Sequence, residues 1–252
     1  FVNNKSIGAF CTKGLSVRPK EGNPVPRITE TECGVLNSVG LQNIGIRKFI
    51  DEKIPKIKEL GPKIIVNFFG NTEQEYIEAA QMLDSVATVF ALEMNVSCPN
   101  VKLGGIGFGQ DAKMLEKLTS EVKKHTKKPL IVKLTPNVTD ITVIAKAAEA
   151  GGADALSLIN TVRGLAIDIN TKKPVLATPI GGYSGKGIKP IALRAVYETA
   201  KAVKVPVIGI GGIYSAEDVL EFIMAGATAV QIGSAVLLDP NVCELISNDL
   251  LE

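Results

Sequence analysis

Short, continuous apolar runs recur along this chain at regular intervals, and they constrain the fold more than any other feature. Each run has the length of a strand, and a segment with helical spacing or capping separates it from the next. Continuous apolar runs are typical of parallel strands that are buried on both faces. We therefore predict an α/β fold, a (β/α)8 TIM barrel, with a doubly wound sheet as the weaker alternative. The predicted strands are 7–11, 63–70, 89–94, 129–136, 155–161, 205–212 and 229–235.

The segments between the strands carry helix signals. Residues 46–60 have helical character, and an alanine-rich helix is predicted to end at Ala150. Thr72 with Glu75, Asp111 and Ser215 are suitable capping residues for three further helices, which are predicted to end near 83, 124 and 224. In contrast, residues 18–43 form a long segment that we predict to be irregular, an ordered lid or substrate wall.

The number of predicted strands is one short of a closed barrel. The chain has 252 residues, close to the roughly 250 of a typical (β/α)8 barrel, but only seven strands can be counted. We expect that a first strand before Phe1 is missing from the chain and that a final helix is cut short. Residues 1–252 are then a single barrel domain, trimmed at both ends.

Composition excludes several classes of function. The net charge is +2 and no basic block is present, so no nucleic-acid footprint is visible. The apolar runs are too short to span a bilayer, and no signal peptide opens the chain. The four cysteines lack C-x-x-C spacing, which favours free thiols in a cytoplasmic protein and no metal site. His125 is the only histidine and lies at a predicted helix end, so histidine-dependent triads are nearly excluded.

The segment Asn95-Val96-Ser97-Cys98-Pro99-Asn100 directly follows one predicted strand and precedes a glycine-rich loop. In α/β proteins this position carries chemistry, although Ser, Pro, Asn and Gly also favour plain turns. Cys98 is a candidate nucleophile or general base. Because no histidine can activate it, proton abstraction is the favoured role. Ser97 has no role that the sequence supports.

Polar groups and glycines also lie at or near the carboxyl ends of the other predicted strands. The last two strands end in glycine turns that can admit a phosphate, or that merely ease a tight turn. Lys133 can stabilise an anion or extend to solvent. Asn37, Asn67, Asn95 and Asn160 suit a planar polar heterocycle. The strand-end residues are Lys13, Asn67, Asn95, Lys133, Asn160 with Thr161, Gly211 with Gly212, and Gly233 with Ser234.

Together these motifs resemble those of class 1 dihydroorotate dehydrogenases. The run 95–105 resembles the active-site loop, and its Val-Lys-x-Gly-Gly continuation resembles the class 1B catalytic subunit. The related dihydropyrimidine dehydrogenases share Ser-Cys-Pro, but their loop differs after it. The family's first-strand Ala-Ser-Gly flavin contact has no match here. Further matches lie at 22–27, 37–43, 133–138, 159–161, 182–185 and 209–212.

The resemblance implies a flavin mononucleotide (FMN) barrel that oxidises dihydroorotate to orotate in pyrimidine (UMP) biosynthesis, with hydride passed to FMN. Cys98 is then the general base. The implied substrate contacts are Lys13, Asn37, Val39, Gly40, Leu41, Asn95, Asn160 and Thr161. The implied cofactor contacts are Lys13, Gly14, Asn67, Asn95, Lys133, Ile159, Gly185, Gly211, Gly212, Gly233 and Ser234.

The class 1B resemblance also implies partners. A second subunit with FAD and a [2Fe-2S] cluster would pass electrons to NAD+, and two catalytic subunits would form a homodimer within a heterotetramer. Two alternatives stay open at this point. One is a class 1A-like enzyme that uses fumarate, and the other is a flavin-binding subunit without turnover.

Overall fold

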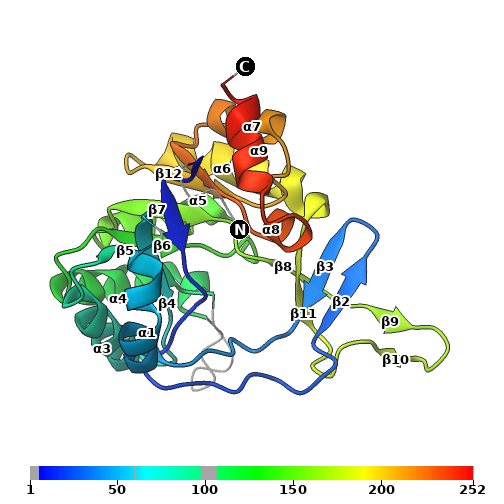
Figure 1. The fold of residues 1–252 in the computed structure, drawn as a ribbon, viewed down its shortest axis with the longest axis horizontal. Helices are drawn as coiled ribbons and strands as arrows, with labels where there is room; N and C mark the ends of the chain where they lie inside the picture. Colours follow the sequence, from blue (N-terminus) through cyan, green and yellow to red (C-terminus); the bar gives the residue numbers. More distant parts are fainter. Residues whose placement is uncertain (1–5, 60, 98–106, 252) are drawn as a thin grey trace.

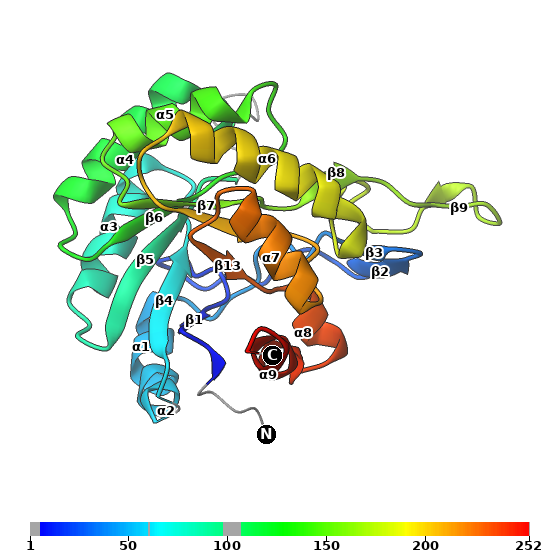
Figure 2. The same cartoon turned by 90° about the horizontal axis from the view of Figure 1, so that it is seen from above.

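The structure is a computed structural model that describes residues 6–59, 61–97 and 107–251. Its centre is a curled sheet of seven strands in the order β1-β4-β5-β6-β7-β12-β13, and every pairing in it is parallel. Helices cover the outer face of the sheet (Figures 1 and 2). The predicted α/β barrel architecture is therefore confirmed. The strands are β1 (Ala9–Cys11), β4 (Lys63–Phe68), β5 (Val89–Asn95), β6 (Leu130–Lys133), β7 (Ala155–Leu158), β12 (Val207–Ile210) and β13 (Ala229–Gln231).

Side-chain caps explain where several helices begin, and the predicted caps Thr72, Asp111 and Ser215 are confirmed. The side chain of Thr72 accepts from the backbone N–H of Glu75 at the start of α3, and Asp111 and Asp140 cap α4 and α5 in the same way. Ser215 forms a capping box with Asp218 at the start of α7. The helices are α1 (Ile46–Glu52), α2 (Ile54–Lys58), α3 (Glu73–Asp84), α4 (Ala112–Lys124), α5 (Ile141–Ala150), α6 (Lys189–Ala202), α7 (Ala216–Met224), α8 (Ser234–Leu238) and α9 (Val242–Asp249).

The core lies between the sheet and the helices. Phe68, Leu92, Leu130 and Leu156 come from four adjacent strands and are fully buried. Leu118 of α4 joins the same cluster from the helical layer. Burying side chains of this size contributes about 1.5–3 kcal/mol each, which makes this layer the main support of the strand ends that follow.

The helical character expected of residues 46–60 is confirmed by α1 and α2, which lie within residues 46–59. The two helices are separated at Lys53, and Pro55 lies in the first turn of the second. Two other expectations about elements were wrong. The last strand is shorter than predicted, since Ser234 already begins α8. The segment 18–43 is not irregular throughout. It contains the hairpin of β2 (Ile28–Thr31) and β3 (Gly34–Asn37).

The hairpin belongs to a second, antiparallel sheet with the order β2-β3-β11-β8. Its other strands are β8 (Val162–Gly164) and β11 (Gly181–Ser184), which come from the segment between β7 and α6. A small ribbon of β9 (Ile167–Asp168) and β10 (Lys173–Pro174) extends from it (Figure 1). Two segments that are distant in sequence, around Asn37 and around Gly182, are thereby paired beside the barrel.

Candidate active site

The carboxyl ends of the seven strands lie at one edge of the barrel, because all the strands run parallel. The strand-end residues in the described part of the chain therefore lie along this edge. Lys13 follows β1, Asn67 lies in β4, Asn95 ends β5 and Lys133 ends β6. Cys98 and the loop around it lie outside the described residues.

A pocket opens among the ends of β6, β7, β11, β12 and β13. It encloses about 530 Å³ of space, counting the open solvent at its mouth. Nine of the residues predicted to bind cofactor or substrate line it, and they come from segments that are far apart in the sequence. They are Lys133, Ile159, Asn160, Thr161, Gly185, Gly211, Gly212, Gly233 and Ser234.

Two glycines of this pocket adopt conformations that other residues avoid. Gly185 has φ +112°, and an added Cβ would lie 2.6 Å from the Cα of Gly34. Gly212 has φ +76°, and an added Cβ would lie 2.6 Å from the Cβ of Lys189. Both backbone turns therefore require glycine, and both bring bare backbone to the pocket wall.

A second cavity, of about 710 Å³ including open solvent, lies on the antiparallel sheet. It is lined by Cys33, Leu36, Arg163 and Tyr183, among others. None of the residues that line it is a carboxyl-terminal residue of the parallel strands. We therefore place the candidate active site at the barrel mouth.

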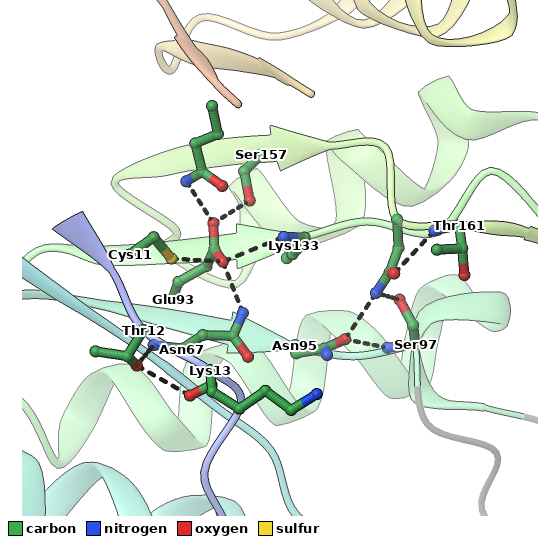
Figure 3. Close-up of polar contacts among 12 residues, drawn as sticks. Cys11, Thr12, Lys13, Asn67, Glu93, Asn95, Ser97, Lys133, Ser157 and Thr161 are labelled. Atoms are coloured by element: carbon green, nitrogen blue, oxygen red, sulfur yellow. Dashed lines mark hydrogen bonds and ion pairs between the residues drawn. The ribbon is translucent and has the colours of Figure 1, made fainter. Parts of the chain in front are cut away.

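An amide network joins the ends of β5 and β7. The Asn160 side-chain nitrogen donates to Asn95 Oδ1 at 3.2 Å and to Ser97 Oγ at 2.9 Å. Asn95 Oδ1 also accepts from the backbone N–H of Ser97, and Asn160 Oδ1 accepts from that of Thr161. Because each oxygen faces a donor, the orientations of both amides are defined, as Figure 3 shows for Asn95, Ser97 and Thr161.

The predicted substrate wall lies against this network. Asn37 donates to the backbone oxygen of Gly182 at 3.3 Å, and an added Cβ on Gly182 would lie 2.2 Å from Thr161 Oγ1. Asn37 is thus held beside Thr161 by the strand pairing of β3 with β11. Gly40 has φ +77° in the adjoining turn, between Val39 and Leu41.

Lys13 and Gly14 reach the same edge from β1. The backbone N–H of Asn67 donates to Thr12 Oγ1 at 3.2 Å, and an added Cβ on Gly14 would lie 2.9 Å from Asn67 Oδ1. Lys13 is exposed, and its side chain extends away from the buried groups of the barrel (Figure 3).

Glu93 is a buried carboxylate that we did not predict as part of the site. It lies in β5 with none of its surface exposed. Oε1 accepts from Asn67 at 2.6 Å and lies 3.5 Å from Lys133 Nζ, while Oε2 accepts from Ser157 and from Gln231, each at 2.8 Å (Figure 3). One sequence signal was available, since Glu93 is the only charged residue in β5 and has apolar neighbours on both sides.

The surroundings of Glu93 keep it ionised. Burial disfavours the carboxylate, but the Lys133 charge and the hydrogen bonds from Asn67, Gln231 and Ser157 outweigh it and lower the pKa of Glu93 below its ordinary value. The Cys11 thiol donates to the same carboxylate at 3.4 Å. Burial, with the Glu93 charge as a second cause, raises the pKa of Cys11 well above its ordinary value, so this thiol stays protonated at neutral pH.

Two classes of feature are not found in the part of the chain described here. Residues 6–59, 61–97 and 107–251 bring no three His, Cys, Asp or Glu side chains together as metal ligands. Nor does any of their helices combine the length and the apolar character that crossing a bilayer requires.

The fold and the pocket define a class: an α/β-barrel protein whose strand ends form a glycine-lined pocket with an amide network and a buried ion pair at its wall. The family model of dihydroorotate dehydrogenase matches residues 1–252. The chain belongs to the dihydroorotate dehydrogenase family, whose members are flavin-dependent oxidoreductases. Its activity is accordingly the oxidation of dihydroorotate in pyrimidine biosynthesis.

Curated relatives give a finer comparison. The chain is 54% identical over 250 residues to proteins from Geobacter sp. (strain M21), Citrifermentans bemidjiense and Geobacter sulfurreducens. Each alignment covers 99% of this chain and 82% of the relative. All three relatives are named dihydroorotate dehydrogenase B (NAD(+)), catalytic subunit.

Proposed function

We propose that this chain is the catalytic subunit of an NAD+-linked dihydroorotate dehydrogenase and that it binds FMN at the barrel mouth. The observation that carries the proposal is the pocket, which gathers Lys133, Gly185, Gly211, Gly212 and Ser234 from separate elements. The names of relatives 54% identical over 99% of the chain support the same reading. Bound FMN would supply the acceptor for the hydride that leaves dihydroorotate.

The residues present fit the cofactor. Gly185 and Gly212 expose backbone where a side chain has no room, and Gly233 has open space around it. Backbone N–H groups in such turns, with the Ser234 hydroxyl, suit a phosphate. Lys133 is positioned to offset negative charge on a reduced flavin. Asn67, Asn95 and Ile159, together with Lys13, Gly14 and Gly211, would hold the ring and the ribityl chain.

Dihydroorotate would bind beside the flavin, against the amide network. Asn95 and Asn160 have defined amide orientations, and Asn37 and Thr161 both lie against Gly182. Amides and a hydroxyl match the alternating carbonyl and N–H groups of a pyrimidine ring. Val39, Gly40 and Leu41 would close one side, and Lys13 would contact both ligands. Cys98 would remove the proton of the substrate as general base.

The electrons would leave through a partner. We propose a second subunit with FAD and a [2Fe-2S] cluster that delivers them to NAD+, and two catalytic subunits paired within a heterotetramer. The printed names of the relatives, with their "NAD(+)" and "catalytic subunit", motivate this assignment. A cytoplasmic location fits the described cysteines Cys11, Cys33 and Cys243, which are free thiols.

The test is purification of the chain alone and together with its partner subunit. We expect the chain alone to be yellow, to release FMN on denaturation and to reduce a dye with dihydroorotate. Together with the partner it should reduce NAD+. A colourless protein that reduces no dye would contradict the proposal. FMN-dependent turnover with fumarate and without any partner would replace the NAD+-linked assignment by a fumarate-linked one.

A further inference from the structure

The buried carboxylate of Glu93 has no part in the proposed hydride or proton transfer, yet it lies directly behind the flavin pocket. Two of its partners, Lys133 and Gln231, line that pocket. A third, Asn67, is a proposed flavin contact. Each carboxylate oxygen has its own set of partners: Oε1 faces Asn67 and Lys133, while Oε2 is held by Ser157 and Gln231.

Glu93 and Lys133 form an ion pair with one end in the pocket wall. The side chain of Glu93 has no exposed surface, whereas that of Lys133 is 18% exposed. The ammonium is therefore the end nearer to a ligand in the pocket. A buried carboxylate is costly unless it is paired and hydrogen-bonded. Glu93 meets both conditions, and its negative charge compensates the positive charge that Lys133 presents to the pocket.

We propose that Glu93 is a positioning residue that fixes the ammonium of Lys133 at the pocket wall, balances its charge, and thereby sets the reduction potential of the bound flavin. This inference rests on the proposed FMN site. A flavin that gains negative charge on reduction is stabilised by a nearby cation and destabilised by a nearby anion. The pair presents to the flavin a cation whose field is partly cancelled by Glu93.

The test compares Glu93→Gln with the wild type as FMN-loaded proteins. Glutamine keeps the shape of the side chain and removes the charge. The readouts are the midpoint potential by dye-coupled titration and the affinity for sulfite, which adds to oxidised flavin and leaves an anion. We expect a more positive midpoint potential and sulfite binding that is tighter by roughly tenfold. The reason is that the positive charge of Lys133 is no longer compensated by a nearby carboxylate in a partly buried site. An unchanged or more negative potential would overturn the proposal.

A matched control separates charge from packing. Ser157→Ala removes one hydrogen bond to the same carboxylate and leaves both charges in place. We expect this variant to lose stability and to keep the wild-type potential and sulfite affinity. If Ser157→Ala moved the potential as far as Glu93→Gln, the effect would be one of packing and the proposal would fail.

The double variant Glu93→Gln/Lys133→Met removes both charges and restores the balance. We expect sulfite affinity at or below that of the wild type. We also expect a higher denaturation midpoint than for Lys133→Met alone, which leaves the buried carboxylate unpaired. The denaturation arm needs no flavin, so it tests the pairing even if Glu93→Gln folds poorly. Equal midpoints for the double variant and Lys133→Met would overturn the pairing.

Failure of this inference differs from failure of the proposed function. A wild-type protein without FMN and without dihydroorotate oxidation would remove the function. If the wild type is yellow and active, and Glu93→Gln has the same flavin midpoint potential, only the proposed role of Glu93 is removed.

Discussion

At the scale of single residues, Ser97 acquires a role that its sequence position did not suggest. Its hydroxyl accepts from the Asn160 side chain, and its backbone N–H donates to Asn95 Oδ1. Ser97 therefore orients two amides proposed to face the substrate. Hydrogen bonds of this kind contribute about 0.5–1.5 kcal/mol, which is enough to change affinity severalfold.

We accordingly predict that Ser97→Ala raises the KM for dihydroorotate by up to about tenfold. The Asn160 amide loses one of its two acceptors in that variant and is held less firmly, by Asn95 and the backbone N–H of Thr161 alone. Steady-state kinetics with a dye acceptor would measure the change, and the flavin absorbance spectrum, expected to be unaltered, is the internal control. A wild-type KM would contradict the orienting role.

Cys98 is the residue whose proposed role has the largest expected effect. Positioned general bases contribute about 10²–10⁴-fold to rate, and a serine hydroxyl is a much poorer base than a thiol. In Cys98→Ser, dihydroorotate should therefore reduce the bound FMN at least about 100-fold more slowly near neutral pH. The variant should still bind FMN. Stopped-flow reduction under anaerobic conditions measures this step, and a wild-type rate would remove Cys98 from the role.

The contrast between Glu93 and the other site residues shows how far the sequence predicts a site. Lys133, Asn160 and the glycine turns lie at the carboxyl ends of predicted strands, so their shared edge could be inferred from parallel topology. Glu93 lies inside a strand, where an apolar run gives no indication of which partners face a side chain. Its donors come from five strands, and only the folded barrel brings them together.

At the scale of elements, the capped helices were the most predictable and the antiparallel sheet the least. The caps Thr72, Asp111 and Ser215 act within one turn of sequence, so a local pattern contains the information. Strands β2 and β8 are short and partly exposed. Their pairing with strands elsewhere in the chain is a tertiary contact, and no local periodicity predicts it.

The capping box of α7 gives a prediction at this scale. Ser215 Oγ accepts from the backbone N–H of Asp218, and the Asp218 carboxylate accepts from the N–H groups of Tyr214 and Ser215. Ser215→Ala should lower the free energy of unfolding by about 1 kcal/mol. Thr72→Ala is the matched control, since it removes the corresponding cap of α3.

Because Tyr214 lines the pocket, Ser215→Ala alone should also weaken FMN binding, which flavin fluorescence titration would detect. Equal FMN affinities in both variants would contradict a link between this cap and the pocket.

At the scale of the whole molecule, the contacts of Glu93 show how strongly the sheet is curled. Gln231 lies on β13, four strands away from β5 in the sheet order. In a flat sheet that offset would be about 19 Å at roughly 4.8 Å per strand, yet the two side chains are 2.8 Å apart. Cys11 of β1 reaches the same carboxylate from the other edge. The two edges of the sheet therefore meet at one buried charge.

This convergence predicts how the whole fold responds to acid. The pKa of Glu93 is lower in the folded chain than its ordinary value of 4.5. A carboxylate with a lowered pKa stabilises the folded state fully above the unfolded value, and that contribution is lost as the pH falls through the folded value. The wild type should therefore lose stability below about pH 4.5 more steeply than Glu93→Gln, which has no carboxylate to protonate at this position. Urea unfolding at pH 7, 5.5, 4 and 3 would measure the difference between the two proteins. We expect the difference in the free energy of unfolding between the wild type and Glu93→Gln to become smaller as the pH falls, because a protonated Glu93 resembles glutamine. A gap that is constant across this range would mean that the carboxylate charge does not hold the two edges of the barrel together.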